Sequence, residues 1–260
     1  MPEMTIANTE IHLWRINQLD FDLHEIQGSC LSWLTEPEKS RYYRYQFDRH
    51  RKQFLLGRIL IRTALSRYDS AIEPANWRFI QNEYGKPAIH PQQQSKPLYF
   101  NLSHSGGRLV LAVACFPDIG VDVECSDKSR RLEAIAGRYF SSKECKSLLE
   151  MPKEQQQSRF YDLWTLKEAY IKACGLGLAI PLQHFSYSFS DIGKLAIEFD
   201  AQREDDIKAW RFWQPLIDAD YKLALAARVN EPELEYNIVS WQMHSLDTVE
   251  AVETIIHRSS

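Results

Sequence analysis

The sequence lacks the features of a secreted, membrane-spanning or nucleic-acid-binding protein. Its five cysteines are scattered and form no C-x-x-C pair, so we expect free thiols in a reducing cytoplasm, without a disulfide framework or zinc site. No apolar run approaches the length of a membrane span. The first ten residues carry two acids and no apolar core, so we expect no signal peptide. The net charge of −4 gives no electrostatic reason to expect non-specific nucleic-acid binding.

Length and composition fit an ordinary globular protein with one large domain or two smaller ones. The chain has 260 residues, of which 44% are apolar, which is enough for a sizeable core and argues against global disorder. Helical patterns followed by strand patterns run to about Phe116, and a strand, helices and further strands follow. This rough echo predicts two α+β subdomains, 1–117 and 118–260.

The segment Phe160–Gly175 predicts a helix around which the rest of the chain can be interpreted. Apolar residues recur at helical spacing, and Gly175 stands where helices commonly end on a left-handed residue. Glu168 and Lys172 are four residues apart, so they share one face of the helix. A surface ion pair is the ordinary interpretation of such a spacing. The aromatic residues around the pair, including Trp164, favour a functional role instead.

An acidic strand precedes this helix in the sequence GVDVE. Asp122 and Glu124 are two residues apart, so both carboxylates point to the same face of the strand. Two carboxylates in an apolar strand cost free energy unless a cation or solvent meets them. Carboxylate oxygens are the ligands that Mg²⁺ takes in proteins. Asp122 and Glu124 are therefore candidate Mg²⁺ ligands.

Three features of the first half are candidates for binding a ligand. A basic, aromatic pair of helices begins with Thr35 as N-cap; most of its arginines are expected on a solvated face, with one or two left for a phosphate. The turn Tyr84–Pro87 contains a glycine that permits close approach of a ligand, or is a plain tight turn with a solvent-facing lysine. His104 follows Ser103 at a strand end, where it is a ligand or a satisfied structural residue.

The remaining pattern is assigned to ordinary helices and strands. The polar stretch 153–157 predicts a bend before the Phe160–Gly175 helix, and the tail 245–260 predicts a short helix. Further helices are expected at Leu55–Leu65 and after Ser141, and strands at Ile11–Ile16, Trp77–Gln81, Tyr99–Ser105, Leu109–Phe116, Phe185–Phe189, Leu195–Phe199, Trp210–Trp213, Tyr221–Val229 and Ile238–Trp241.

Taken in chain order, the motifs resemble those of 4′-phosphopantetheinyl transferases of the Sfp type. GVDVE followed some forty residues later by W-x-x-K-E-x-x-x-K is the specific pair, and the resemblance extends from about Thr35 to Leu182. Members of this family are pseudo-dimers of two similar α+β subdomains with the active site in the cleft between them. The motifs are GRILIR (Gly57–Arg62), EYGKP (Glu83–Pro87), FNLSHS (Phe100–Ser105), GVDVE (Gly120–Glu124), RYFS (Arg138–Ser141) and WTLKEAYIKACGLGL (Trp164–Leu178).

The resemblance implies a reaction and a metal. Coenzyme A would donate its 4′-phosphopantetheine arm to a serine of an apo acyl or peptidyl carrier protein, releasing 3′,5′-adenosine bisphosphate (3′,5′-ADP). Asp122 and Glu168 match the family's Mg²⁺ ligands, and Glu124 matches a third position that is not acidic in every member. Lys172 matches the lysine near the pyrophosphate. Glu168 is also the nearest base for the serine, directly or through water.

The resemblance also implies where coenzyme A binds. Arg41 and His104 match residues that hold its phosphates, and Ser103 falls in the same pocket. The segment of Tyr84, Gly85, Lys86 and Pro87 matches the backbone that lines the adenine, with Lys86 as a further phosphate contact. We expect a carrier helix to dock near Cys115–Pro117 or on the segment after Arg131.

Two other functions compete with the transferase. A non-catalytic module that binds coenzyme A or a carrier would have no use for Asp122, Glu168 and Lys172 together. A Mg²⁺-dependent nucleotide phosphatase or diesterase would share the acids but would not need the Gly85-Lys86-Pro87 and Ser103-His104 motifs. The physiological carrier stays open among fatty-acid, polyketide, nonribosomal-peptide and amino-adipate enzymes. We expect a cytoplasmic monomer that binds neither nucleic acid nor membranes.

Overall fold

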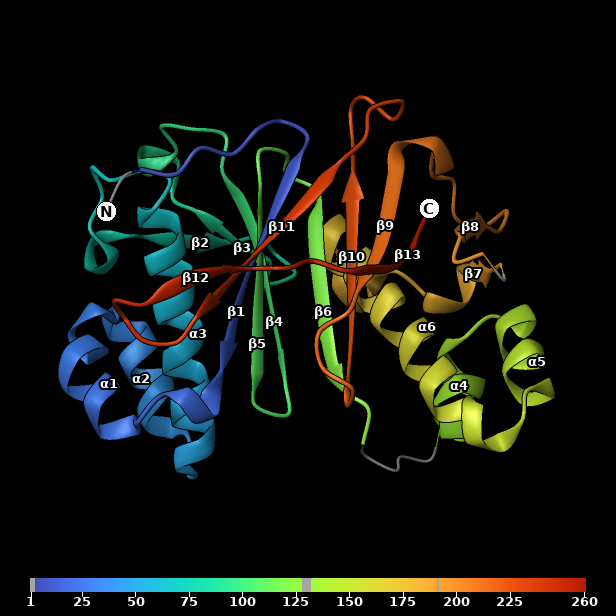
Figure 1. Cartoon of the computed structure of the whole chain (residues 1–260), viewed down its shortest axis with the longest axis horizontal. Helices are drawn as coiled ribbons and strands as arrows, with labels where there is room; N and C mark the ends of the chain where they lie inside the picture. The colour runs from blue at the N-terminus through green and yellow to red at the C-terminus, as the bar shows by residue number, and fades with distance from the viewer. Residues whose placement is uncertain (1–2, 128–131, 191) are drawn as a thin grey trace. The chain divides into compact units, whose positions relative to one another are not determined.

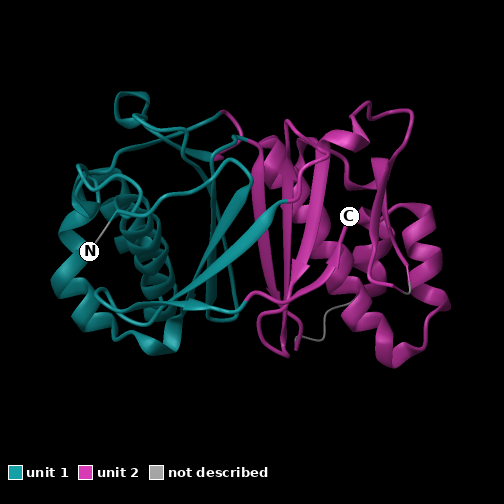
Figure 2. Ribbon diagram, turned by 45° about the horizontal axis from the view of Figure 1, so that its top comes forward, with its two compact units in different colours: residues 1–82, 87–117, 236–253 teal, residues 83–86, 118–235, 254–260 magenta. Residues whose placement is uncertain are grey.

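The computed structural model describes residues 3–127, 132–190 and 192–260, and their contacts divide into two units (Figure 2). Unit 1 contains the described residues of 1–82, 87–117 and 236–253. Unit 2 contains those of 83–86, 118–235 and 254–260. Each unit has its own helices and sheet, which confirms the α+β class. These units differ from the expected subdomains, 1–117 and 118–260, because 236–253 join the first unit and 83–86 the second.

Unit 1 is a five-stranded sheet covered by helices, with strand order β12-β11-β1-β5-β4 (Figure 1). The central strand β1 (Glu10–Asn17) pairs antiparallel with β5 (Arg108–Ala114) and parallel with β11 (Asn237–Met243). The other strands are β4 (Tyr99–Ser105), β12 (Val249–Val252) and the hairpin β2 (Phe79–Gln81) and β3 (Pro87–Ile89). The helices are α1 (Leu23–Cys30), α2 (Glu36–Arg44) and α3 (Asp48–Ser66), with 3-10 turns at Gln18–Asp20, Leu31–Trp33, Pro74–Asn76 and Pro91–Gln93.

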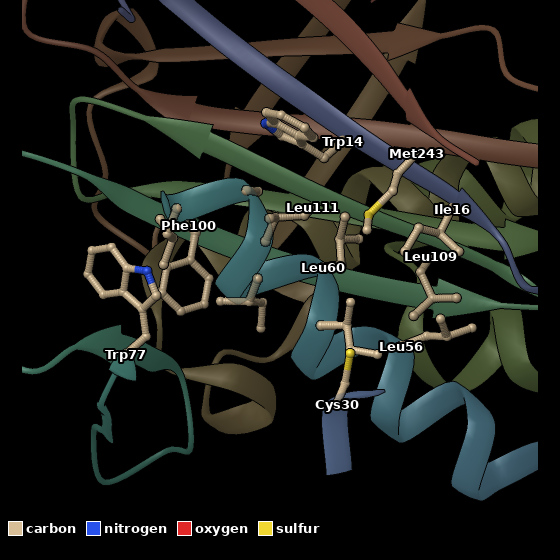
Figure 3. Packing of buried hydrophobic residues seen from close by; sticks show 14 of the residues in the cluster. Trp14, Ile16, Cys30, Leu56, Leu60, Trp77, Phe100, Leu109, Leu111 and Met243 are labelled. Carbon is tan, nitrogen blue, oxygen red and sulfur yellow. The ribbon is translucent and has the colours of Figure 1, made fainter. Parts of the chain in front are cut away.

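Helix α3 supplies the helical side of the unit 1 core. Leu56 and Leu60 are fully buried and lie toward Leu109 and Leu111 of β5 (Figure 3). Trp77 and Phe100 extend the same cluster of buried side chains. Helix α2 begins with a capping box in which the side chains of Thr35 and Glu38 satisfy each other's backbone N–H groups. The expected N-cap at Thr35 is confirmed.

Unit 2 is a four-stranded sheet, order β13-β9-β10-β6, packed against a long helix. The strands are β6 (Ile119–Cys125), β9 (Trp210–Pro215), β10 (Tyr221–Arg228) and β13 (Ile256–Ser259), and a separate hairpin joins β7 (Phe185–Phe189) to β8 (Leu195–Phe199). The helices are α4 (Leu132–Tyr139), α5 (Ser142–Glu150) and α6 (Lys153–Cys174), with 3-10 turns at Gly177–Ala179, Leu182–His184 and Ile207–Ala209. Among the described helices, none is long and apolar enough to cross a membrane.

Most expected elements are present, and two expectations are wrong. The tail forms strands β12 and β13, not a helix, because its backbone hydrogen-bonding groups pair with β11 and β9. The polar stretch 153–157 is the first part of α6, not a bend; polar side chains suit a helix that is exposed at its start. The helix ends as expected at Gly175, which has a φ of 71°. The pattern also missed α1 and the short strand β3.

Candidate active site

A close approach of helix α6 to strand β6 builds the acidic part of the site. A Cβ atom at Gly120 would lie 2.0 Å from the carbonyl oxygen of Ala169 and 2.5 Å from the backbone nitrogen of Ala173. Only glycine allows the helix backbone this near the strand. Asp122 follows two residues later on the same face of β6, so its carboxylate also points toward α6.

Lys172 of α6 binds Asp122 of β6. Its Nζ lies 2.6 Å from Asp122 Oδ1 and 3.3 Å from the carbonyl oxygen of Val121, while Asp122 is only 4% exposed. The lysine therefore pairs across to the strand, and the simple Glu168–Lys172 surface pair is not what the structure shows. In the described part of the chain, Glu168 makes no ion pair.

Glu168 carries the most telling electrostatic perturbation in this cluster. Partial burial raises its pKa to about 7, helped by the negative charges of Asp122 and Glu124 and opposed by Lys172. A carboxyl group with such a pKa exchanges protons near neutral pH, which suits a general base. The shift also shows that the three acids lie close enough to repel one another. We name Asp122, Glu124, Glu168 and Lys172 the acidic cluster.

The acidic cluster offers the ligand atoms that a hard cation prefers, but its side chains are not yet arranged around a metal ion. All three acids offer carboxylate oxygens, and a cation would offset the repulsion that raises the pKa of Glu168. Across residues 3–127, 132–190 and 192–260, however, no three His, Cys, Asp or Glu side chains are already gathered tightly enough to hold a metal ion. Mg²⁺ commonly takes one or two carboxylates and completes its shell with water and substrate phosphate, so the residues fit this ion.

The turn before β3 contributes a second lysine to unit 2. Lys86 Nζ donates a hydrogen bond of 2.8 Å to the carbonyl oxygen of Ala173, near the C-terminal end of α6. A cation at this end of a helix is favourable, because unpaired carbonyl groups gather there. Burial lowers the pKa of Lys86. Gly85 has a φ of 87° and Tyr84 is exposed, so the backbone of this turn is open to a ligand.

In unit 1, Arg41 and His104 line the same hollow. Its volume is about 290 Å³, and its wall is formed by α2, α3 and β4. The Arg41 guanidinium lies 5.4 Å from the centroid of the Phe54 ring and pairs with no carboxylate of the described residues. We name this site the basic hollow; its lining residues are Arg41, Tyr45, His50, Gln53, Phe54, Gly57, Arg58, Leu102 and His104.

The structure does not bring Ser103 into the basic hollow. Side chains alternate along β4, so Ser103 lies on the face opposite Leu102 and His104 and is buried there. Pro87 begins β3 and lines a second hollow of unit 1. The assigned roles of Ser103 and Pro87 remain predictions from the resemblance.

The sequence pattern does not predict the roles of two residues in these sites. Gly120 was recognised as part of a motif and not as a contact point, although the small residues Ala169 and Ala173 at helical spacing are the signal for close packing. Arg58 was counted among the arginines of a solvated face, but it lines the basic hollow. Nothing in the order of residues distinguishes it from the other arginines of α3.

Comparison with known proteins shows the family of this chain. The 4′-phosphopantetheinyl transferase superfamily model matches residues 118–226, and the model of a 4′-phosphopantetheinyl transferase N-terminal region matches residues 24–116. The chain is 37% identical over 207 residues to 4′-phosphopantetheinyl transferase Sfp of Bacillus subtilis, covering 79% of this chain and 86% of the relative. It is 37% identical over 178 residues to 4′-phosphopantetheinyl transferase HetI of a Nostoc species, covering 68% and 74% respectively. The chain belongs to the 4′-phosphopantetheinyl transferase family.

Proposed function

We propose that this enzyme transfers the 4′-phosphopantetheine arm of coenzyme A to a serine of an apo carrier protein, and that Mg²⁺ assists. The observation that carries the proposal is the acidic cluster, in which Lys172 is bound to Asp122 and Glu168 has a pKa of about 7. Family membership supports the reaction class. The basic hollow supports a polyanionic donor such as coenzyme A.

Each residue of the acidic cluster has a separate task in this reaction. Asp122 and Glu168 would hold Mg²⁺, which neutralises charge on the pyrophosphate when bound, and Glu124 is a third ligand candidate. Lys172 lies on Asp122 and would place its positive charge beside the pyrophosphate as negative charge grows on the departing bisphosphate. Glu168 accepts the proton of the attacking serine, directly or through water.

The basic hollow and the Tyr84–Pro87 turn would bind the nucleotide end of the donor. Arg41 and His104, which line the hollow, would hold the 3′-phosphate. The exposed backbone at Tyr84 and Gly85 would line the adenine, with Lys86 as a second phosphate contact. The pantetheine arm reaches a partner protein, so it needs no enclosed pocket.

Two further properties belong to the proposal. All five cysteines are free thiols, which supports a reducing, cytoplasmic location. We also propose that the protein acts as a monomer. Its carrier would dock near Cys115–Pro117 or on α4, the described helix that follows Arg131; Arg131 itself lies outside the described residues.

A mass measurement separates the proposed transferase from its competitors. The protein is incubated with coenzyme A, Mg²⁺ and a panel of apo carriers, and each carrier is weighed by mass spectrometry. A transferase adds phosphopantetheine to at least one carrier, and the gain disappears with EDTA or when the carrier serine is changed to alanine. A binding module gives no gain, and a hydrolase consumes coenzyme A without any carrier. Either of these two results would overturn the proposal.

A further inference from the structure

Arg58 of α3 lines two hollows of unit 1. It lines the basic hollow together with Arg41 and His104. It also lines a second hollow of about 390 Å³, whose wall includes Arg41, Arg44 and Glu38. The Arg58 side chain is 18% exposed, so a ligand in either hollow can reach it.

The guanidinium of Arg58 is oriented by neighbours that leave its end groups available. Its central carbon lies 5.1 Å from the centroid of the Phe54 ring, and Arg41 lies 5.4 Å from the same centroid. Its Nε faces Glu38 Oε1 at 3.4 Å. An arginine carries four more N–H groups on its two Nη atoms. Those of Arg58 make no hydrogen bond to any residue that the structure describes.

The charges around Arg58 are unbalanced. Glu38 is the one carboxylate lining the second hollow, and it already accepts a hydrogen bond of 2.7 Å from Arg62 and another from the backbone N–H of Thr35. Burial lowers the pKa of Arg58, and the charges of Arg62 and Arg41 lower it further against the pull of Glu38. Arg58 and Arg62 therefore contact one carboxylate while Arg41 adds a third positive charge nearby, and a bound anion would offset their repulsion.

We infer that Arg58 is a further binding residue for the donor, acting with Arg41 on the 3′-phosphate of coenzyme A. This inference rests on the proposed function. A phosphate dianion offers several acceptor oxygens, and the Nη fork of an arginine can hold two of them at once. Stacking on Phe54 and the contact with Glu38 hold the fork in place before the ligand arrives. Arg58 would thus favour donors with a 3′-phosphate over donors without one.

The test is a binding titration with two nucleotides that differ by the 3′-phosphate. The dissociation constants of 3′,5′-ADP and 5′-AMP are measured by calorimetry for the wild type, Arg58→Gln and Arg58→Lys. We expect Arg58→Gln to raise the dissociation constant of 3′,5′-ADP about 10- to 100-fold, because a charge-assisted hydrogen bond is lost. Binding of 5′-AMP should change little. Arg58→Lys should restore only part of the affinity, since a point charge does not reproduce the fork.

Arg49→Gln is the matched control. Arg49 lies on the same helix, and its guanidinium carbon also lies 5.1 Å from a phenylalanine ring, that of Phe47, but it lines neither hollow. We expect this variant to bind both nucleotides like the wild type. The melting temperature of ligand-free Arg58→Gln should equal or exceed that of the wild type, because a repelled cation is removed. A purely structural Arg58 would lower it.

The outcomes distinguish the inference from the proposed function. If the wild type binds 3′,5′-ADP no better than 5′-AMP, the proposed nucleotide site itself is wrong. If the wild type discriminates and Arg58→Gln binds 3′,5′-ADP equally well, only the role of Arg58 is overturned. Equal weakening of both nucleotides would also overturn it. If Arg58→Gln fails to fold, Arg58→Lys provides the test. A preference for 3′,5′-ADP as strong as that of the wild type would contradict the claim that the two Nη atoms of Arg58 hold the 3′-phosphate.

Discussion

The acidic cluster of unit 2 has a surplus of negative charge, and the basic hollow of unit 1 and its surroundings have a surplus of positive charge. In the first, Lys172 pairs with Asp122 beside two further carboxylates, and burial together with the charges of Asp122 and Glu124 raises the pKa of Glu168 to about 7. Beside the second, Arg58 and Arg62 contact Glu38, and burial together with the charges of Arg62 and Arg41 lowers the pKa of Arg58. Such surpluses oppose folding. Each can be offset by a ligand of the opposite charge, a cation in unit 2 and phosphate in unit 1.

The largest expected effect comes from removing an acid of unit 2. Asp122→Ala should abolish transfer to an apo carrier, because it deletes a proposed metal ligand and the partner of Lys172. The fold should remain, since Asp122 contributes charge more than packing. The measurement is single-turnover transfer with circular dichroism alongside. Turnover like that of the wild type in saturating Mg²⁺ would contradict the metal assignment.

Removing the lysine of the acidic cluster should lower the rate of transfer nearly as much. Lys172→Ala is expected to lower kcat by about 10²- to 10³-fold, because charge stabilisation that grows in the transition state is lost. The melting temperature should change little, since the Lys172 side chain is partly exposed and water can take its place beside Asp122. Lys172→Arg should recover part of the rate. Unchanged turnover in Lys172→Ala would return the pair to a structural role.

Two glycine variants compare the tolerance of the two sites to added volume. Gly120→Ala should destabilise the protein by about 3 kcal/mol or more, because its Cβ meets the backbone of α6, which cannot move aside locally. Gly57→Ala in α3 should be nearly neutral. Its Cβ meets the end of the Leu102 side chain at 3.1 Å, and alanine favours a helix by about 1 kcal/mol. Chemical unfolding of both variants is the measurement; equal losses would show that α6 is not held by this contact.

Variants of the basic hollow should affect binding more than the chemical step. Arg41→Ala and His104→Ala should each weaken the binding of coenzyme A by about tenfold or more, because each removes a contact to phosphate. Dephospho-coenzyme A should be a poorer donor for the wild type and nearly as good as coenzyme A for the variants. KM values for both donors test this. An equal preference in wild type and variants would exclude a role in reading the 3′-phosphate.

The smallest expected effect is a pH dependence of stability without metal. The folded pKa of Glu168 is about 7, above its ordinary 4.5, so between these values the folded state binds more protons than the unfolded state. Stability therefore falls as the pH rises through this window. In EDTA, Glu168→Gln should melt above the wild type at about pH 8 and converge with it as the pH falls toward about 4.5. A constant difference would contradict the raised pKa of Glu168.

Sequence reasoning worked best where a pattern is local. The periodicity of α6, the alternation of β6 and the N-cap at Thr35 depend on neighbouring residues, and all three are confirmed. It failed for the tail 245–260, whose strands depend on distant partners in β11 and β9. The partners of Lys172 and Lys86 likewise come from contacts across the sequence. Predicting the excess positive charge at Arg58 would have required knowing which arginines contact Glu38.

The most direct test of phosphopantetheinyl transfer counts both products of one turnover. Wild type and Glu168→Gln are mixed with coenzyme A, Mg²⁺ and an apo carrier that the wild type modifies, and the loaded carrier and free 3′,5′-ADP are quantified together. We expect the wild type to release one 3′,5′-ADP for each carrier loaded, and Glu168→Gln to produce neither at a comparable rate. Release of 3′,5′-ADP without carrier loading, or full activity of Glu168→Gln, would contradict the assignment of function and site.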